Sequence, residues 1–119
     1  MQSWRQLGSI WQLRPKQPRG LIEFIGGSYL AATPQVSYRR ILEDLCNAGL
    51  AIHAWAYVPG FDHQSQAKEA WMAFRQARRQ LEDCCGGLPT ALRLGHSLGC
   101  KLHLLAPDGG RGSHGLVAL

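Results

Sequence analysis

The sequence has no long hydrophobic run, few cysteines and no leader-like start. Its apolar stretches, such as residues 50–56 with a histidine at position 53, stay far below the ~18 residues that a membrane-spanning helix requires. Residues 1–6 lack the apolar core of a secretory signal. The four cysteines, at positions 46, 84, 85 and 100, are therefore expected to be reduced, buried thiols. We expect a cytoplasmic protein without a transmembrane segment.

Acidic residues are also scarce. Eight Asp and Glu stand against 13 Lys and Arg, which gives a net charge of +5. A basic chain can attract anions, but its arginines and lysines are scattered and are not interleaved with aromatics as on a single-strand-binding surface. We therefore expect no nucleic-acid partner. Nucleic-acid binding, whose affinity would fall steeply with salt concentration, ranks third, behind the two hypotheses given below.

What is present is the composition of one globular domain. Of the 119 residues, 45% are hydrophobic and 18% charged, which favours a packed core. Glycines separate short apolar runs from amphipathic segments. Strands are predicted at residues 9–14, 21–25, 50–58, 90–94 and 115–119, and helices from Thr33-Pro34 to about Gly49, along the stretch holding Ala67 to Leu81, and over 97–105.

Strands alternating with helices at this spacing predict an α/β fold. We expect a three-layer α/β/α sandwich with a mostly parallel sheet covered by helices on both faces. The final residues, 115–119, stop inside an apolar run. Residues 1–119 are therefore expected to form a single incomplete domain, truncated at its C-terminus.

The strongest chemical signal is the G-x-S-x-G sequence of Gly95, His96, Ser97, Leu98 and Gly99. It lies between a predicted strand and a predicted helix. A catalytic serine must be lifted clear of the sheet on a tight turn, which leaves room only for small residues two positions before and two positions after it. Ser97 is therefore the predicted nucleophile, and the alternative is a glycine-rich turn with an incidental serine.

Acyl transfer also needs hydrogen-bond donors for the developing oxyanion. The N–H of Leu98, at the start of the helix, is the first candidate. The second is expected from the loop after strand 21–25, where Gly27 or Ser28 can present a backbone N–H. The glycines of this loop are equally compatible with a simple tight turn.

At three places the chain resembles the α/β-hydrolase superfamily: residues 24–27, 57–63 and 95–99. As a whole it resembles an uncharacterised hydrolase-like family of cyanobacteria and plant plastids, most distinctively over residues 26–34 and 95–103. The resemblance implies the hydrolase fold, a serine nucleophile and a small-molecule ester or acyl substrate of unknown identity. It also implies a plastid location if the source is a plant. Ile25 stands where many relatives carry a histidine.

The acid and the base of a catalytic triad are harder to place. Hydrolases of this fold have the order serine, then acid, then histidine. Asp108 and His114 follow Ser97 in that order, but Asp108 comes a whole strand early, and the adjacent Asp62 and His63 precede the serine. We therefore expect both partners beyond residue 119, and a 119-residue chain that is inactive or nearly so.

Two other motifs are interpreted as incidental. Residues 110–115 spell G-x-G-x-x-G, but they precede a strand and do not open a helix as a dinucleotide site requires. His96, Cys100 and His103, with cysteines 84–85, have the spacing of zinc ligands but no paired C-x-x-C. We therefore expect no cofactor and no metal. The alternative to a serine esterase is a non-catalytic hydrolase-like scaffold that binds a lipid, a pigment or a protein; the oligomeric state is left open.

Overall fold

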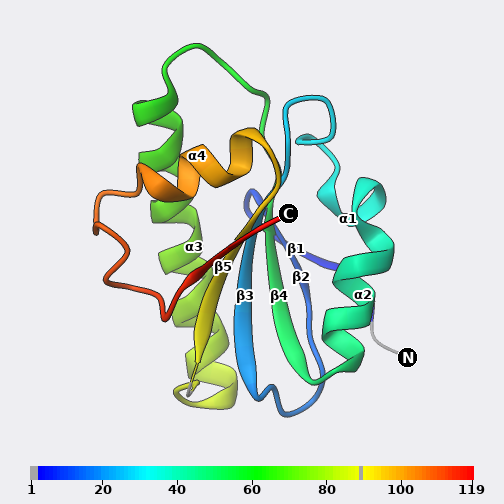
Figure 1. The fold of residues 1–119 in the computed structure, drawn as a ribbon. Coiled ribbons are helices and arrows are strands. Elements are labelled where there is room, and N and C mark those ends of the chain that lie inside the picture. Colours follow the sequence, from blue (N-terminus) through cyan, green and yellow to red (C-terminus); the bar gives the residue numbers. More distant parts are fainter. Residues whose placement is uncertain (1–2, 89) are drawn as a thin grey trace.

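The computed structural model describes residues 3–88 and 90–119, and six strands in this part form one mixed sheet (Figure 1). The strand order is β1-β2-β4-β3-β5-β6. β4, β3, β5 and β6 run parallel, whereas β1 and β2 are antiparallel to their neighbours. The strands are β1 (Arg5–Leu7), β2 (Ile10–Leu13), β3 (Gly20–Ile25), β4 (Leu50–Trp55), β5 (Ala91–Gly95) and β6 (Leu116–Ala118).

Helices cover both faces of this sheet, as Figure 1 shows. α1 (Pro34–Ser37) and α2 (Arg39–Asn47) lie on one face, and α3 (His63–Cys85) and α4 (Leu98–Leu104) on the other. The predicted three-layer α/β/α sandwich is thereby confirmed. None of the helices in residues 3–88 and 90–119 is long and apolar enough to cross a membrane.

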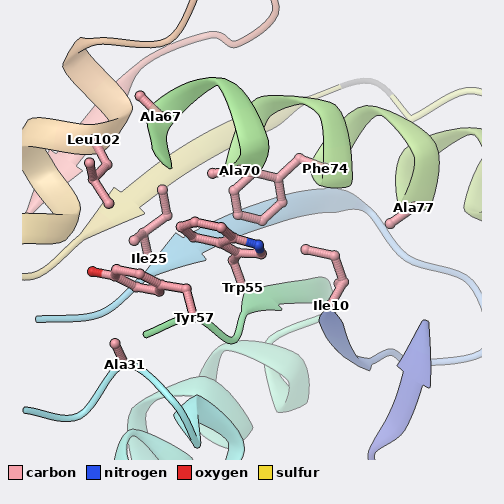
Figure 2. Packing of buried hydrophobic residues seen from close by; sticks show 10 residues of the cluster. All are labelled: Ile10, Ile25, Ala31, Trp55, Tyr57, Ala67, Ala70, Phe74, Ala77 and Leu102. Atoms are coloured by element: carbon pink, nitrogen blue, oxygen red, sulfur yellow. The ribbon is translucent and has the colours of Figure 1, made fainter. Parts of the chain in front are cut away.

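Three clusters of buried apolar residues fill the spaces between the sheet and the helices in the described part of the chain, and the smallest contains Leu21 and Leu81. Figure 2 shows the core under α3 and α4, where Trp55 and Tyr57 stack with ring centroids 4.4 Å apart. The indole N–H of Trp55 donates to Ser9 Oγ at 3.2 Å, so this large side chain is buried without losing its hydrogen bond. On the opposite face, Phe24 and Leu42 belong to the core under α1 and α2.

The N-terminal strand differs from the prediction. Residues 9–14 were expected to form one strand, and the structure gives β2 at Ile10–Leu13, joined to an unpredicted β1 by a tight turn. Gly8 takes a positive φ of +61° in this turn, which a glycine adopts without steric cost. β1 has only three residues, and none of them is buried. The sequence therefore has no alternation of apolar and polar residues that would predict this strand.

Two further boundaries are shifted by tertiary contacts. The helix predicted from Thr33-Pro34 breaks at Tyr38, whose φ of −115° is not helical and whose buried ring packs edge-on against Phe24 at 4.6 Å. The strand predicted over residues 50–58 ends at Trp55. The N–H of Tyr57 donates to the carbonyl of Ala31 in a loop instead of to a neighbouring strand.

The cysteines only partly follow the prediction. No disulfide joins the four, all of which lie in the described part of the chain. Cys46 is buried as expected, and burial raises the pKa of its thiol. Cys84 is exposed instead of buried, because it lies in the last turn of α3 beyond the apolar face of that helix. Cys85 and Cys100 are only partly buried. The Arg14 guanidinium donates to the sulfurs of Cys84 and Cys85 at 3.2 and 3.4 Å.

Candidate active site

Ser97 has an unusual backbone conformation. It lies between the end of β5 and the start of α4, with φ 57° and ψ −120°, and it is the only non-glycine residue with positive φ in the described part of the chain. A non-glycine residue in such a region costs on the order of 1–3 kcal/mol, and strain of this kind clusters at functional sites. The residue is exposed at the carboxyl edge of the sheet.

The turn around Ser97 is closely packed. A β-carbon added at Gly95 would lie 2.7 Å from the backbone nitrogen of Cys100, and one added at Gly99 would overlap the carbonyl oxygen of Ile25. Both obstacles are backbone atoms, which cannot move aside without displacing β3 or α4. The two glycines are therefore needed where the turn brings strand and helix together.

The loop after β3 lies against this turn. A β-carbon at Gly27 would approach the β-carbon of Ser97 to 3.3 Å. The N–H of Gly27 donates to the hydroxyl of Tyr38 at 2.8 Å, and the same hydroxyl lies 2.8 Å from Nδ1 of His96. Tyr38 therefore connects the loop to the residue that precedes the serine.

The three predicted oxyanion donors differ in whether their N–H groups are already hydrogen-bonded. The N–H of Gly27 is already engaged by Tyr38. The N–H groups of Leu98 and Ser28 make no hydrogen bond to any residue in ranges 3–88 and 90–119. Leu98 and Ser28 thus have backbone donors available for a ligand, and Gly27 does not.

Tyr57 supports the same loop from the segment that follows β4. Its hydroxyl donates to the carbonyl of Gly26 at 2.7 Å. Burial raises the pKa of Tyr57 to about 12, with a smaller contribution from Tyr38, so the phenol stays protonated and keeps this hydrogen bond at physiological pH. Sequence reasoning missed both tyrosines, since neither has a local signal for a role at the turn.

No base is placed at the serine by the described residues. The Ser97 hydroxyl has no hydrogen-bond partner among them. Asp108 is held by Arg93 in two hydrogen bonds of 3.0 and 2.5 Å, and Nδ1 of His114 accepts from the N–H of Ala91 at 3.1 Å. Asp108 and His114 were considered as the acid and the base, but the structure pairs them with Arg93 and Ala91 and not with Ser97.

The Asp62-His63 pair also has a structural explanation. Oδ1 of Asp62 accepts from the N–H of Ser65 at 3.0 Å, which makes Asp62 the N-cap of α3. An aspartate is favoured at this position because it satisfies a backbone donor that the helix leaves open. His63 is then the first residue of the helix.

The structure places the two motifs interpreted as incidental in turns and in α4. The G-x-G-x-x-G stretch lies in turns before β6 and opens no helix. Residues 3–88 and 90–119 contain no group of three or more His, Cys, Asp or Glu that could hold a metal ion. Nε2 of His103 instead lies 3.2 Å from the carbonyl oxygen of Leu94.

Solved structures share this architecture. The chain is similar to Esterase B from Lactobacillus rhamnosis, at 16% identity and a TM-score of 0.68 over 98% of this chain and 44% of that one. It is similar to a cold-adapted esterase from an Arctic intertidal metagenomic library, at 14% identity and 0.61 over 98% and 61%. It is also similar to a putative thioesterase from Silicibacter sp. TM1040, at 21% and 0.57 over 83% and 39%.

These likenesses show the fold: the chain has the α/β-hydrolase fold over the part that it shares with them. It spans between 39% and 61% of the length of the three structures. The chain belongs to the family described as Protein of unknown function (DUF1350), which matches residues 3–111. A comparison with curated proteins found no match. The predicted resemblance to a hydrolase-like family of unknown reaction is confirmed.

Proposed function

We propose that this chain forms the nucleophile-bearing part of a serine hydrolase that cleaves esters or acyl esters. The observation that carries the proposal is the strained, exposed conformation of Ser97 between β5 and α4. Such strain persists only where the surrounding structure enforces it, and Gly95 and Gly99 permit the contacts that do so. The esterase neighbours support a hydrolase of this fold, and the assignment of the serine is ours.

In the proposed reaction, Ser97 Oγ attacks the carbonyl carbon of the ester. Its proton passes to a base that lies outside the described residues, and the N–H groups of Leu98 and Ser28 stabilise the oxyanion. The ester C–O bond breaks, and the leaving alcohol takes the proton from the base. Water then cleaves the acyl-serine and releases the acid. Without a base at Ser97, we expect the 119-residue chain by itself to hydrolyse esters only slowly.

A fluorophosphonate probe tests the proposal on the full-length protein. The expected result is covalent labelling of the wild type, none of Ser97→Ala, and unchanged labelling of Ser113→Ala, a control serine in the turns before β6. Labelling of the wild type and Ser97→Ala to the same extent would show that another residue reacts, and would refute the assignment.

The second candidate is a non-catalytic scaffold that keeps the turn for packing and binds a partner. One observation favours it: the Ser97 hydroxyl has no hydrogen-bond partner among the described residues. Under this hypothesis the folded full-length protein resists the probe, and cells carrying Ser97→Ala behave as wild type. Labelling that depends on Ser97 rejects it.

A further inference from the structure

A second candidate site lies away from Ser97, between α3 and α4. It is a cavity of about 440 Å³ over β3 and β5, which falls within the range of about 300–1,000 Å³ typical of small-molecule sites. α3 connects β4 to β5, and α4 connects β5 to β6, so both helices lie between strands of the described sheet. Its walls are therefore formed within this chain.

The cavity has a charged end. Glu23 on β3 and Arg93 on β5 are direct neighbours in the sheet. Glu23 Oε1 accepts from Arg78 Nη2 at 2.8 Å, and Arg93 is held by Asp108 in the two hydrogen bonds described above. These side chains balance one another, two positive against two negative.

One donor at this end is unused. Nε of Arg78 is buried and has no hydrogen-bond partner in the described residues, although its two terminal nitrogens donate to Glu23 and to the carbonyl of Gly112. A buried donor without an acceptor costs about 1–3 kcal/mol. The Arg78 side chain is 26% exposed, so a shift of this side chain would present Nε to an acceptor from a ligand and relieve that cost.

The mouth of the cavity carries excess positive charge. Three exposed arginines, Arg75, Arg79 and Arg111, line it together with a single acid, Glu82. Because the inner charges cancel, the lining as a whole has an excess of two positive charges. This surplus favours an anionic ligand, and the carboxylates of Glu23 and Asp108 favour a position of its charge at the mouth, away from them.

The other end of the cavity is apolar. Ile25 lies two residues beyond Glu23 on the same face of β3, and Phe74 and Leu102 face it from α3 and α4. Ala67 and Ala70 line the same end, and Figure 2 shows all five side chains in the core under α3 and α4. The lining thus changes from charged to apolar along the sheet.

We propose that this cavity binds a small monocarboxylic acid with an apolar body. The carboxylate lies among Arg75, Arg78 and Arg111, whose planar guanidinium groups match the two oxygens of a carboxylate. The apolar body packs on Ile25, Phe74 and Leu102. The site is separate from Ser97, and the proposal does not depend on hydrolysis.

Octanoate is the probe that tests this site. We would titrate it into the full-length Ser97→Ala protein and follow backbone amide and arginine Nε signals by NMR. Saturable shifts are expected at Arg78 Nε and at the amides around the cavity. Octan-1-ol, with the same chain and no charge, should bind at least about tenfold more weakly, since it leaves the arginines without a carboxylate. Acetate, with the same charge and no chain, should give no saturable shift.

A pair of variants tests the arginines. Arg75→Gln with Arg111→Gln should weaken octanoate binding by about fivefold or more, whereas Arg5→Gln with Arg40→Gln, which removes two exposed arginines elsewhere, should change it by less than about twofold. The proposal is overturned if octanoate gives no saturable shift up to about 10 mM, if octan-1-ol binds equally well, or if both double variants have the same effect. Because the Ser97→Ala protein is used throughout, failure of the proposed catalysis leaves this result unaffected.

Discussion

Two buried histidines should make the fold sensitive to mild acid. His53 in β4 is completely buried, with Nε2 2.9 Å from Nε2 of Gln12 and no hydrogen-bond partner in the described residues for Nδ1. His103 in α4 is 5% exposed. Burial lowers the pKa of each from 6.5 to about 4, with smaller contributions from Arg78 at His53 and from Arg93 at His103.

Acid should destabilise the fold, because the unfolded chain binds protons at these two histidines at a higher pH than the folded chain does. The unfolded chain protonates these imidazoles near pH 6.5, whereas the folded chain does so only near pH 4. Their stabilisation is therefore complete above about pH 6.5 and is lost as the pH falls toward 4. Between about pH 7.5 and pH 5, each histidine should lower the free energy of unfolding by about 2 kcal/mol, at 1.36 kcal/mol per pKa unit.

Urea denaturation at these two pH values measures the effect. Burial raises the pKa of Glu23 and so acts in the opposite direction, because the folded state then takes up a proton before the unfolded one. The comparison is therefore made between the wild type and His53→Gln or His103→Gln, each of which should lose about 2 kcal/mol less than the wild type on acidification. His63→Gln, at the first residue of α3, is the control for removing one histidine.

One result would refute the reasoning. If acidification destabilises the wild type and both variants by the same amount, within about 0.5 kcal/mol, then the two imidazoles gain a proton as easily in the folded state as in the unfolded chain. Their enclosure by β4 and α4 would then not control their charge.

Three further changes test the geometry, each by urea denaturation near pH 7. Gly99→Ala places a β-carbon onto a strand carbonyl and should cost about 3 kcal/mol or more, whereas Gly87→Ala, with no atom within 4 Å, should cost less than about 1 kcal/mol. Ser97→Gly should stabilise the fold by about 1 kcal/mol relative to Ser97→Ala, and equal stabilities would argue against backbone strain. Asp108→Asn should cost about 3 kcal/mol by removing the carboxylate that is hydrogen-bonded to the buried Arg93, and a loss below about 1 kcal/mol would contradict that role.

Much of the fold was predictable because it depends on local pattern. The apolar run 21–25 and the spacing of Ala70, Phe74 and Ala77 gave β3 and α3 in nearly their observed positions. Thr33-Pro34 correctly gave the start of α1. Each of these signals is carried by neighbouring residues, whose backbone preferences and periodicity do not depend on distant parts of the chain.

The sequence also determined which residues could form the turn around Ser97, since the spacing of Gly95 and Gly99 is local. It did not determine what surrounds that turn. Tyr38 reaches Gly27 and His96 only because the helix breaks and the ring packs beneath the loop after β3.

The cavity between α3 and α4 was decided by tertiary structure alone. Glu23 and Arg93 are 70 positions apart in the sequence, and each is a single charge within an otherwise apolar strand. Strand register makes them neighbours, and the packing of α3 and of the turn after α4 adds Arg78 and Asp108. Charges are tolerated in this interior because each finds an opposite partner, and such pairing across distant segments leaves no periodic signal in the sequence.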